Sequence, residues 1–167
     1  IAFGEDSRIC LNPFSDIESY EDEEDILYGL VSTMAALRDP LSDLQAARVK
    51  QLMQAMYQLH GNDMLVDHLA EACTADDDQR VRDVGVQLHP FTKNGAYGRW
   101  FHGRCNYRAD APFVLLELEK LDGRHQLQRV VLLQLIYRIQ KDMDLGERDQ
   151  PKILVIDEAW ELLEGPE

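Results

Sequence analysis

The central part of the chain has the hydrophobic pattern of a series of short helices. Between residues 26 and 88, apolar side chains recur every three or four positions, and polar start signals appear at short intervals. The first helix is predicted over residues 26–37, because Pro40 disfavours helix in the residue before it. The second is predicted to begin at Ser42, which has capping-box spacing with Gln45.

Two further helices are predicted after a stop at Gly61. Asn62 or Asp63 can cap the third helix, and Thr74 together with Asp77 can open the fourth. Their apolar stripes indicate core packing rather than a cofactor site. Core packing is also predicted for three methionines of this region, which are Met53, Met56 and Met64.

The last third of the chain has a different pattern. Residues 113–118 and 153–156 are nearly continuous apolar runs of strand length, and residues 127–139 form a longer helical segment between them. Strand, helix and strand in this order predict one βαβ unit, whose parallel strands lie in a sheet covered on both faces. The predicted fold class is therefore α/β, with a mostly α-helical region ahead of the βαβ unit.

Composition adds a strong negative charge to this picture. The 167 residues include 31 Asp and Glu against 17 Lys and Arg, which gives a formal net charge of −14. Such a surface repels a phosphate backbone, so we expect no autonomous nucleic-acid binding. Half of the charge, seven acidic residues with no basic one, lies between Asp16 and Asp25. This stretch is either a solvated lead into the first helix or an acidic surface on which a partner docks.

The cysteines, the apolar runs and the first residue of the chain indicate the cellular compartment that we expect for the protein. Three widely separated cysteines lack the pattern of a disulfide framework, which favours a reducing compartment. The longest apolar runs, residues 113–116 and 130–133, are far shorter than the roughly 20 residues of a membrane helix. The chain begins with Ile1 rather than Met, and we expect it to be an excerpt from a longer protein that shows no secretory signal.

Residues 93–108 are a locally basic and aromatic segment rich in glycine. Basic residues beside aromatic rings can bind single-stranded nucleic acid by stacking. We favour the alternative, a glycine-rich connection whose aromatic side chains pack back onto the domain. His102 and Cys105 have the spacing of half a metal site, but the sequence offers no second half.

The second apolar run ends in two adjacent carboxylates, Asp157 and Glu158. An apolar strand that ends in Asp-Glu has the form of a Walker B segment. One carboxylate at the strand tip helps to hold hydrated Mg²⁺ beside nucleotide phosphates, and the next can orient and deprotonate the attacking water. A phospho-accepting receiver domain also places acids after an apolar strand, but on its first strand, whereas Asp157 lies ten residues from the end of this chain.

Four segments carry a family resemblance. They are Leu11-Asn12-Pro13-Phe14, residues 95–103, residues 113–118 with Leu121, and residues 156–163. In this order they resemble TraC-like ATPases, the motor proteins of conjugative transfer and type IV secretion, which are related to the FtsK/HerA branch of RecA-like P-loop proteins. The resemblance spans essentially the whole chain, and its most specific part is Asp157-Glu158-Ala159-Trp160.

The resemblance implies a partial RecA-like P-loop NTPase sheet of parallel strands with a mostly α-helical insertion. Residues 1–14 would begin the ATPase core, residues 15–90 would form the insertion, and residues 91–167 would form the βαβ part of the core. Asp157 would be the metal-associated acid and Glu158 the catalytic glutamate. ATP and Mg²⁺ would be the cofactors of the full-length protein.

The resemblance also implies partners and a location. The full-length protein would form an oligomeric ring on the cytoplasmic face of the bacterial inner membrane, in contact with inner-membrane components of the secretion or conjugation machinery. The chain contains no GxxxxGK[ST] phosphate-binding loop, so alone it is expected neither to bind ATP tightly nor to hydrolyse it. The residues also allow an alternative function, an interaction module that docks through the acidic helical region.

Overall fold

The computed structural model describes residues 7–36, 40–107, 113–118, 121, 123–145, 153 and 155. The chain divides into two compact units. One is continuous, Arg8–Tyr107, and the other combines Ile1–Ser7 with Arg108–Glu167. The predicted boundaries at residues 14 and 90 remain predictions.

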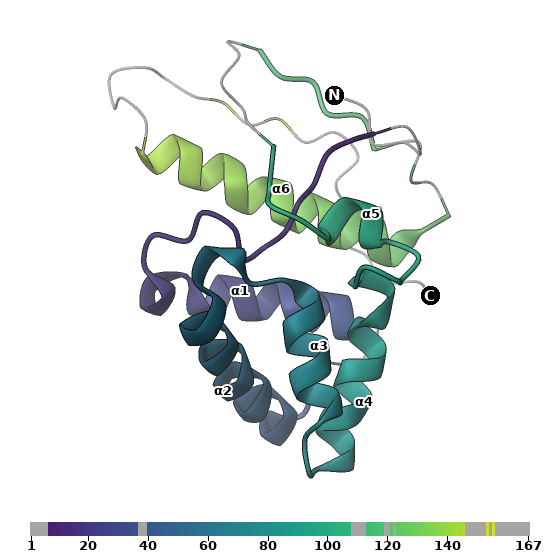
Figure 1. Ribbon diagram of the computed structural model, residues 1–167. Helices are drawn as coiled ribbons and strands as arrows, with labels where there is room; N and C mark the ends of the chain where they lie inside the picture. Colours follow the sequence, from purple (N-terminus) through teal and green to yellow (C-terminus); the bar gives the residue numbers. More distant parts are fainter. Residues whose placement is uncertain are drawn as a thin grey trace. The chain divides into compact units, whose positions relative to one another are not determined.

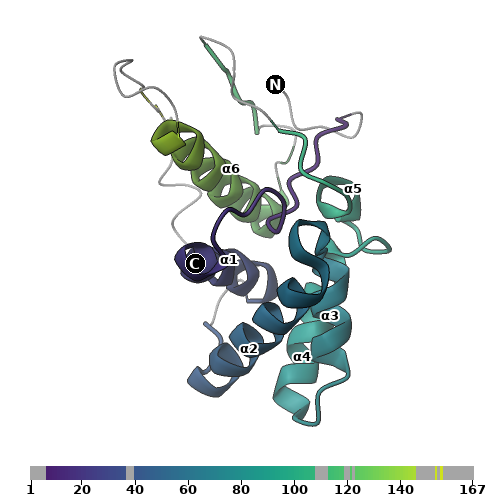
Figure 2. The same ribbon diagram turned by 60° about the vertical axis from the view of Figure 1, so that its left-hand side comes forward.

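The unit formed by residues 8–107 is built from helices joined by short turns. Figures 1 and 2 show α3 and α4 side by side and antiparallel, with α1 and α2 packed beside them. In chain order the elements are α1 (Tyr20–Ala35), α2 (Asp43–His60), the 3₁₀ turn η1 (Gly61–Asp63), α3 (Val66–Thr74), α4 (Gln79–Leu88), the 3₁₀ turn η2 (His89–Phe91) and the short α5 (Gly98–Phe101).

Local capping sets the ends of α1 and α2. The capping box predicted at the start of α2 is confirmed, because the Ser42 hydroxyl accepts from Gln45 N–H while the Gln45 side chain accepts from Ser42 N–H. Gly61 is the C-cap, also as predicted. Helix α1 begins at Tyr20, earlier than predicted, because Ser19 caps it. The carboxylates of its first turn also stabilise this start, because they interact favourably with the positive end of the helix dipole.

The predicted starts of α3 and α4 are off by a few residues. Leu65 is the N-cap of α3, since Asn62 and Asp63 are absorbed in the 3₁₀ turn before it. Asp78 caps α4, and its side chain accepts a hydrogen bond from Arg80 N–H. The error is small because capping residues are abundant in both connections, and sequence alone does not say which one is used.

The core of residues 8–107 is apolar and well buried. Met53 and Met64 are fully buried, as predicted, while Met56 is half-buried. The largest fully buried side chains of this unit come from all five of its α-helices, from η2 and from the loops before α1 and before α3: Trp100, Phe14, Phe91, Phe101, Leu11, Leu27, Met34, Met53, Met64, Leu69 and Leu88. Burying one such side chain contributes about 1.5–3 kcal/mol to folding.

The second unit contains one long described helix, α6 (His125–Leu145), which confirms the helix predicted over residues 127–139. Its buried apolar side chains include Leu127, Val130, Val131 and Leu135. None of the helices in the described part of the chain is both long and apolar enough to cross a lipid bilayer.

The predicted fold class is wrong for the residues that the structure describes. They form helices and no sheet, so the partial RecA-like sheet of parallel strands and the βαβ unit are not found. Residues 113–118 contain no regular strand apart from a single bridge at Glu117, and Phe113 and Leu115 are 82% and 57% exposed. Ile153 and Val155 are 86% and 81% exposed.

The physical reason lies in what a buried strand requires. A parallel strand needs hydrogen-bonded neighbours along its edges and helices over both faces. The apolar runs at residues 113–118 and 153–156 have the composition of such strands, but composition does not supply the neighbours. None of the described residues of either run is buried, so these residues do not form a sheet core.

Candidate functional site

The predicted Walker B residues lie outside the described residues. Asp157 and Glu158 both fall there, so their roles stay predictions. His102 and Cys105, which have the spacing of half a metal site, are both described. His102 Nδ1 lies 3.3 Å from a carboxylate oxygen of Asp67, and Cys105 is buried. Among the residues with described positions, no group of three or more His, Cys, Asp or Glu side chains could hold a metal ion.

Two of the four motif segments, distant in sequence, meet in the unit formed by residues 8–107. Leu11 N–H donates to the Trp100 carbonyl at 2.6 Å, and Asn106 N–H donates to the Cys10 carbonyl at 3.2 Å. The Asn106 side chain accepts from Cys10 N–H at 2.8 Å. The Asn-Pro-Phe element and the glycine-aromatic element therefore form one joint, at which the two ends of the unit are hydrogen-bonded together.

Asn12 holds this joint to the start of α3. Its side chain is 1% exposed, donates to the Met64 carbonyl at 2.8 Å and accepts from Phe14 N–H at 3.2 Å. The buried Ser15 hydroxyl accepts from Cys105 N–H at 2.9 Å. A buried amide that satisfies two backbone groups is a structural device, because losing it would leave both groups without partners.

The aromatic side chains of residues 93–108 pack back onto the helices, as predicted. Trp100 and Phe101 are buried, and the Phe101 ring meets the Phe91 ring edge-on with centroids 5.1 Å apart. A Cβ at Gly95 would collide with the backbone of His89 and Pro90, which explains why a glycine stands there. Buried rings are not available to stack on nucleic-acid bases.

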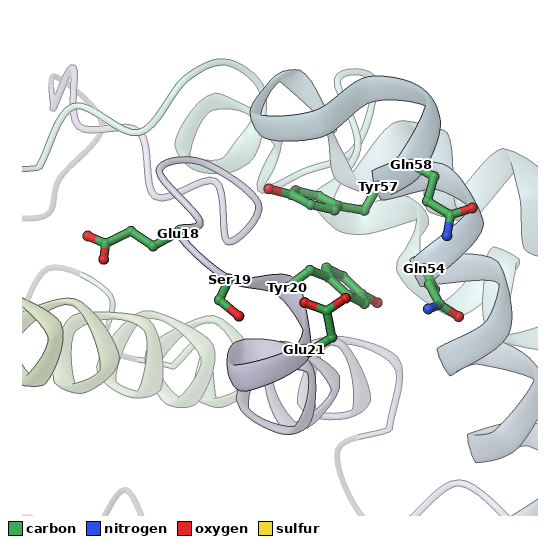
Figure 3. Close-up of a pocket in the computed structure, with 7 residues that line it drawn as sticks. All are labelled: Glu18, Ser19, Tyr20, Glu21, Gln54, Tyr57 and Gln58. Atoms are coloured by element: carbon green, nitrogen blue, oxygen red, sulfur yellow. The ribbon is translucent and has the colours of Figure 1, made fainter.

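A pocket of about 480 Å³ lies between the start of α1 and the last part of α2. Its lining is Glu18, Ser19, Tyr20, Glu21, Gln54, Tyr57 and Gln58 (Figure 3). Tyr20 and Tyr57 stack with ring centroids 4.8 Å apart and ring planes 21° apart. Figure 3 shows the two rings one over the other with their hydroxyl groups at opposite ends and the Tyr20 hydroxyl pointing toward Gln54.

Burial governs the chemistry of this tyrosine pair. It raises the pKa of both hydroxyls, with a smaller contribution from Glu24 at Tyr20 and from Glu23 at Tyr57, so both rings stay neutral at physiological pH. Tyr20 is 8% exposed, and its hydroxyl oxygen has no hydrogen-bond partner among the described residues. This pair could not be predicted from the sequence, because its two members come from different helices.

A pair of stacked histidines lies just beyond the pocket, where α2 ends at His60. The rings of His60 and His68 stack with centroids 3.8 Å apart, and His68 Nδ1 accepts from Leu65 N–H at 3.2 Å. Burial, followed by the neighbouring His60, lowers the pKa of His68. This arrangement caps the start of α3 as long as His68 is neutral.

Comparison with known proteins gives one relationship. The chain is 30% identical to the protein TraC of Escherichia coli (strain K12) over an aligned length of 167 residues, which covers 92% of this chain and 19% of TraC. No protein-family model and no solved structure matches it. The similarity covers nearly all of the chain. This chain is a distant homologue of TraC over a stretch that spans about a fifth of that protein's length.

Proposed function

We propose that this chain is part of an ATP-hydrolysing motor that energises type IV secretion or conjugative transfer. The observation that carries the proposal is the 30% identity to TraC over 92% of the chain. The motor would work on the cytoplasmic face of the bacterial inner membrane, as an oligomeric ring in contact with inner-membrane components of the machinery.

Asp157 and Glu158 are the proposed catalytic pair. Adjacent carboxylates fit Mg²⁺, because it prefers hard oxygen ligands and is usually held by one or two carboxylates and the substrate phosphates. When bound, Mg²⁺ neutralises charge on the transferred phosphoryl group. Asp157 would hold the hydrated ion, and Glu158 would accept the proton of the attacking water.

The chain alone is proposed to be inactive. Most of the grip on nucleotide phosphates comes from the backbone amides and lysine of a phosphate-binding loop, and the 167 residues contain no GxxxxGK[ST] sequence. Without that loop, two adjacent carboxylates repel the nucleotide. Hydrolysis therefore depends on residues that this sequence does not contain.

The test is the substitution Glu158→Gln in a longer protein that contains this chain. Removing a general base reduces turnover by about 10²–10⁴-fold. ATP binding should be retained, because the amide has the size of the carboxylate and leaves the phosphate contacts intact. Hydrolysis is followed by phosphate release, and binding by a fluorescent ATP analogue.

Glu161→Gln is the matched control, because it removes a neighbouring carboxylate outside the Asp-Glu pair. Its turnover should stay within about twofold of the unsubstituted protein. Unchanged turnover in Glu158→Gln would show that another group activates water. Mg²⁺-dependent turnover by the 167-residue chain itself, abolished by the same substitution, would contradict the proposed inactivity of the isolated chain.

A further inference from the structure

The pocket between α1 and α2 carries negative charge at its mouth, and no basic side chain of its lining neutralises that charge. Glu18 and Glu21 are exposed, and the lining contains no basic side chain. Neither carboxylate has an ion-pair partner among the described residues. Lys50 of α2 is engaged elsewhere, by Asp25 at 2.5 Å and by the Tyr28 ring at 5.1 Å. The pocket therefore attracts a cation.

The start of α1 also affects which sign of ligand charge the pocket favours. A helix N-terminus carries roughly half a positive charge, which by itself favours an anion. Here the Ser19 hydroxyl accepts a hydrogen bond from Asp22 N–H, and three carboxylates, Glu21, Asp22 and Glu23, lie in the first turn. Three negative charges exceed the partial positive charge, so an anion is disfavoured at this end of the helix.

The tyrosine pair supplies an independent reason for a ligand. A buried hydroxyl without a partner costs free energy that a bound donor restores. The Tyr20 hydroxyl is such a group, since its oxygen is fully covered and unpartnered among the described residues. A donor that reached this oxygen could form a hydrogen bond with it, and the face of the Tyr57 ring turned away from Tyr20 can attract a cation. The volume of about 480 Å³ lies within the range of small-ligand sites.

We propose that this pocket binds an arginine side chain from a basic segment of a partner protein. A planar guanidinium fits the three kinds of group present: it stacks on an aromatic ring, pairs with carboxylates and donates to a neutral oxygen. Glu18 and Glu21 would pair with it at the mouth, and Tyr57 would contact its flat face. This surface gives the acidic helical region a specific partner chemistry, and it does not rest on the ATP-hydrolysing role.

The test uses the complete 167-residue chain and two fluorescently labelled peptides. One is Gly-Ser-Arg-Gly-Arg-Ser-Gly, and the other is the same peptide with both arginines replaced by citrulline. Citrulline keeps the size and shape of arginine but is neutral. Fluorescence anisotropy at low salt should give a Kd about tenfold higher for the citrulline peptide. Equal binding of the two peptides would overturn the proposal, as would undetectable binding of the arginine peptide at millimolar concentration.

Charge-matched variants separate the pocket from general attraction to an acidic protein. Glu18→Gln combined with Glu21→Gln should raise the Kd of the arginine peptide about tenfold. Glu71→Gln combined with Asp77→Asn removes the same charge from exposed positions outside the pocket and should change it less than about twofold. Equal weakening by both pairs would show that the pocket is not the binding site.

The aromatic contribution is tested by Tyr57→Leu, which keeps apolar volume and removes the ring. Because Tyr57 is only half-buried, this variant is expected to fold, and circular dichroism checks that it does. The Kd should rise about threefold, and the preference for arginine over a matching lysine peptide should fall. An unchanged Kd and preference would contradict the proposed ring contact. None of these outcomes depends on whether Glu158 is catalytic.

Discussion

His68 shows how a single neutral side chain can support a helix start. Its Nδ1 accepts the Leu65 N–H, and its ring lies on that of His60. Protonation would remove the acceptor and would place a cation against a neighbouring imidazole. The surrounding titratable groups act in both directions, since Glu71 and Asp67 favour the charged form while His60 and His102 oppose it.

Stability should fall in mild acid because of His68. Its pKa is lowered in the folded chain from the ordinary value of 6.5, so the unfolded chain binds more protons just below that pH. The stability that neutral His68 contributes to the folded chain is complete above pH 6.5 and is lost as the pH falls through the lowered pKa. Urea unfolding at several pH values between 5 and 7.5 measures it.

His68→Gln is the control for this titration. Glutamine does not titrate and is a favourable third helical residue in a capping box. The variant should lose less free energy of unfolding between pH 7 and pH 5 than the unsubstituted chain does. Identical pH profiles would show that His68 is not the group responsible.

At the scale of elements, two glycines in helices have opposite surroundings. Gly29 lies on an exposed part of α1, and a Cβ built there would have no atom within 4 Å. Gly85 lies where α4 approaches α3, and a Cβ there would be 2.7 Å from the Ala70 carbonyl oxygen and 2.8 Å from Thr74 N. The absence of a side chain at Gly85 lets the two helices approach closely.

The same substitution should therefore have opposite effects at these positions. Gly29→Ala is expected to stabilise the chain by about 0.5–1 kcal/mol, since alanine is the better helix former. Gly85→Ala is expected to destabilise it by about 1–3 kcal/mol, because the new methyl group forces α3 and α4 apart. Urea unfolding of both variants measures the change. A stabilised Gly85→Ala variant would contradict the close approach.

Elements differ in how far the sequence predicts them. The capping box of Ser42 and Gln45 was predictable because both partners lie within one helical turn. The run at residues 113–118 was not, because an apolar run does not reveal what covers it, and Phe113 proves to be 82% exposed. The partners of a local hydrogen bond lie close together in the sequence, whereas the strands of a sheet can lie far apart in it.

At the scale of the molecule, some features of the candidate sites could be predicted from the sequence and others could not. The motif order predicted the relationship to TraC, which the 30% identity confirms. The joint between Leu11 and Trp100 and the stacking of Tyr20 on Tyr57 were not predictable, because each joins residues far apart in the sequence. The acidic stretch between Asp16 and Asp25 was recognised as a possible docking surface, but its pocket required α2 as the opposite wall.

The continuous unit should fold without the rest of the chain. Residues 8–107 hold their own apolar core, and their ends are hydrogen-bonded to each other. Expressed alone, this segment should show a helical circular dichroism spectrum and a cooperative thermal transition. A gradual, non-cooperative loss of signal would show that its core needs residues 108–167.

The joint between the ends of this unit also has a consequence for synthesis. Asn106 contacts the backbone of both Arg8 and Cys10, so the unit can close as soon as residue 107 has left the ribosome. At about 5–20 residues per second, residues 108–167 then take several more seconds to emerge. The helical unit can thus fold before the rest of the second unit has emerged, which keeps its apolar helices away from the apolar runs that follow.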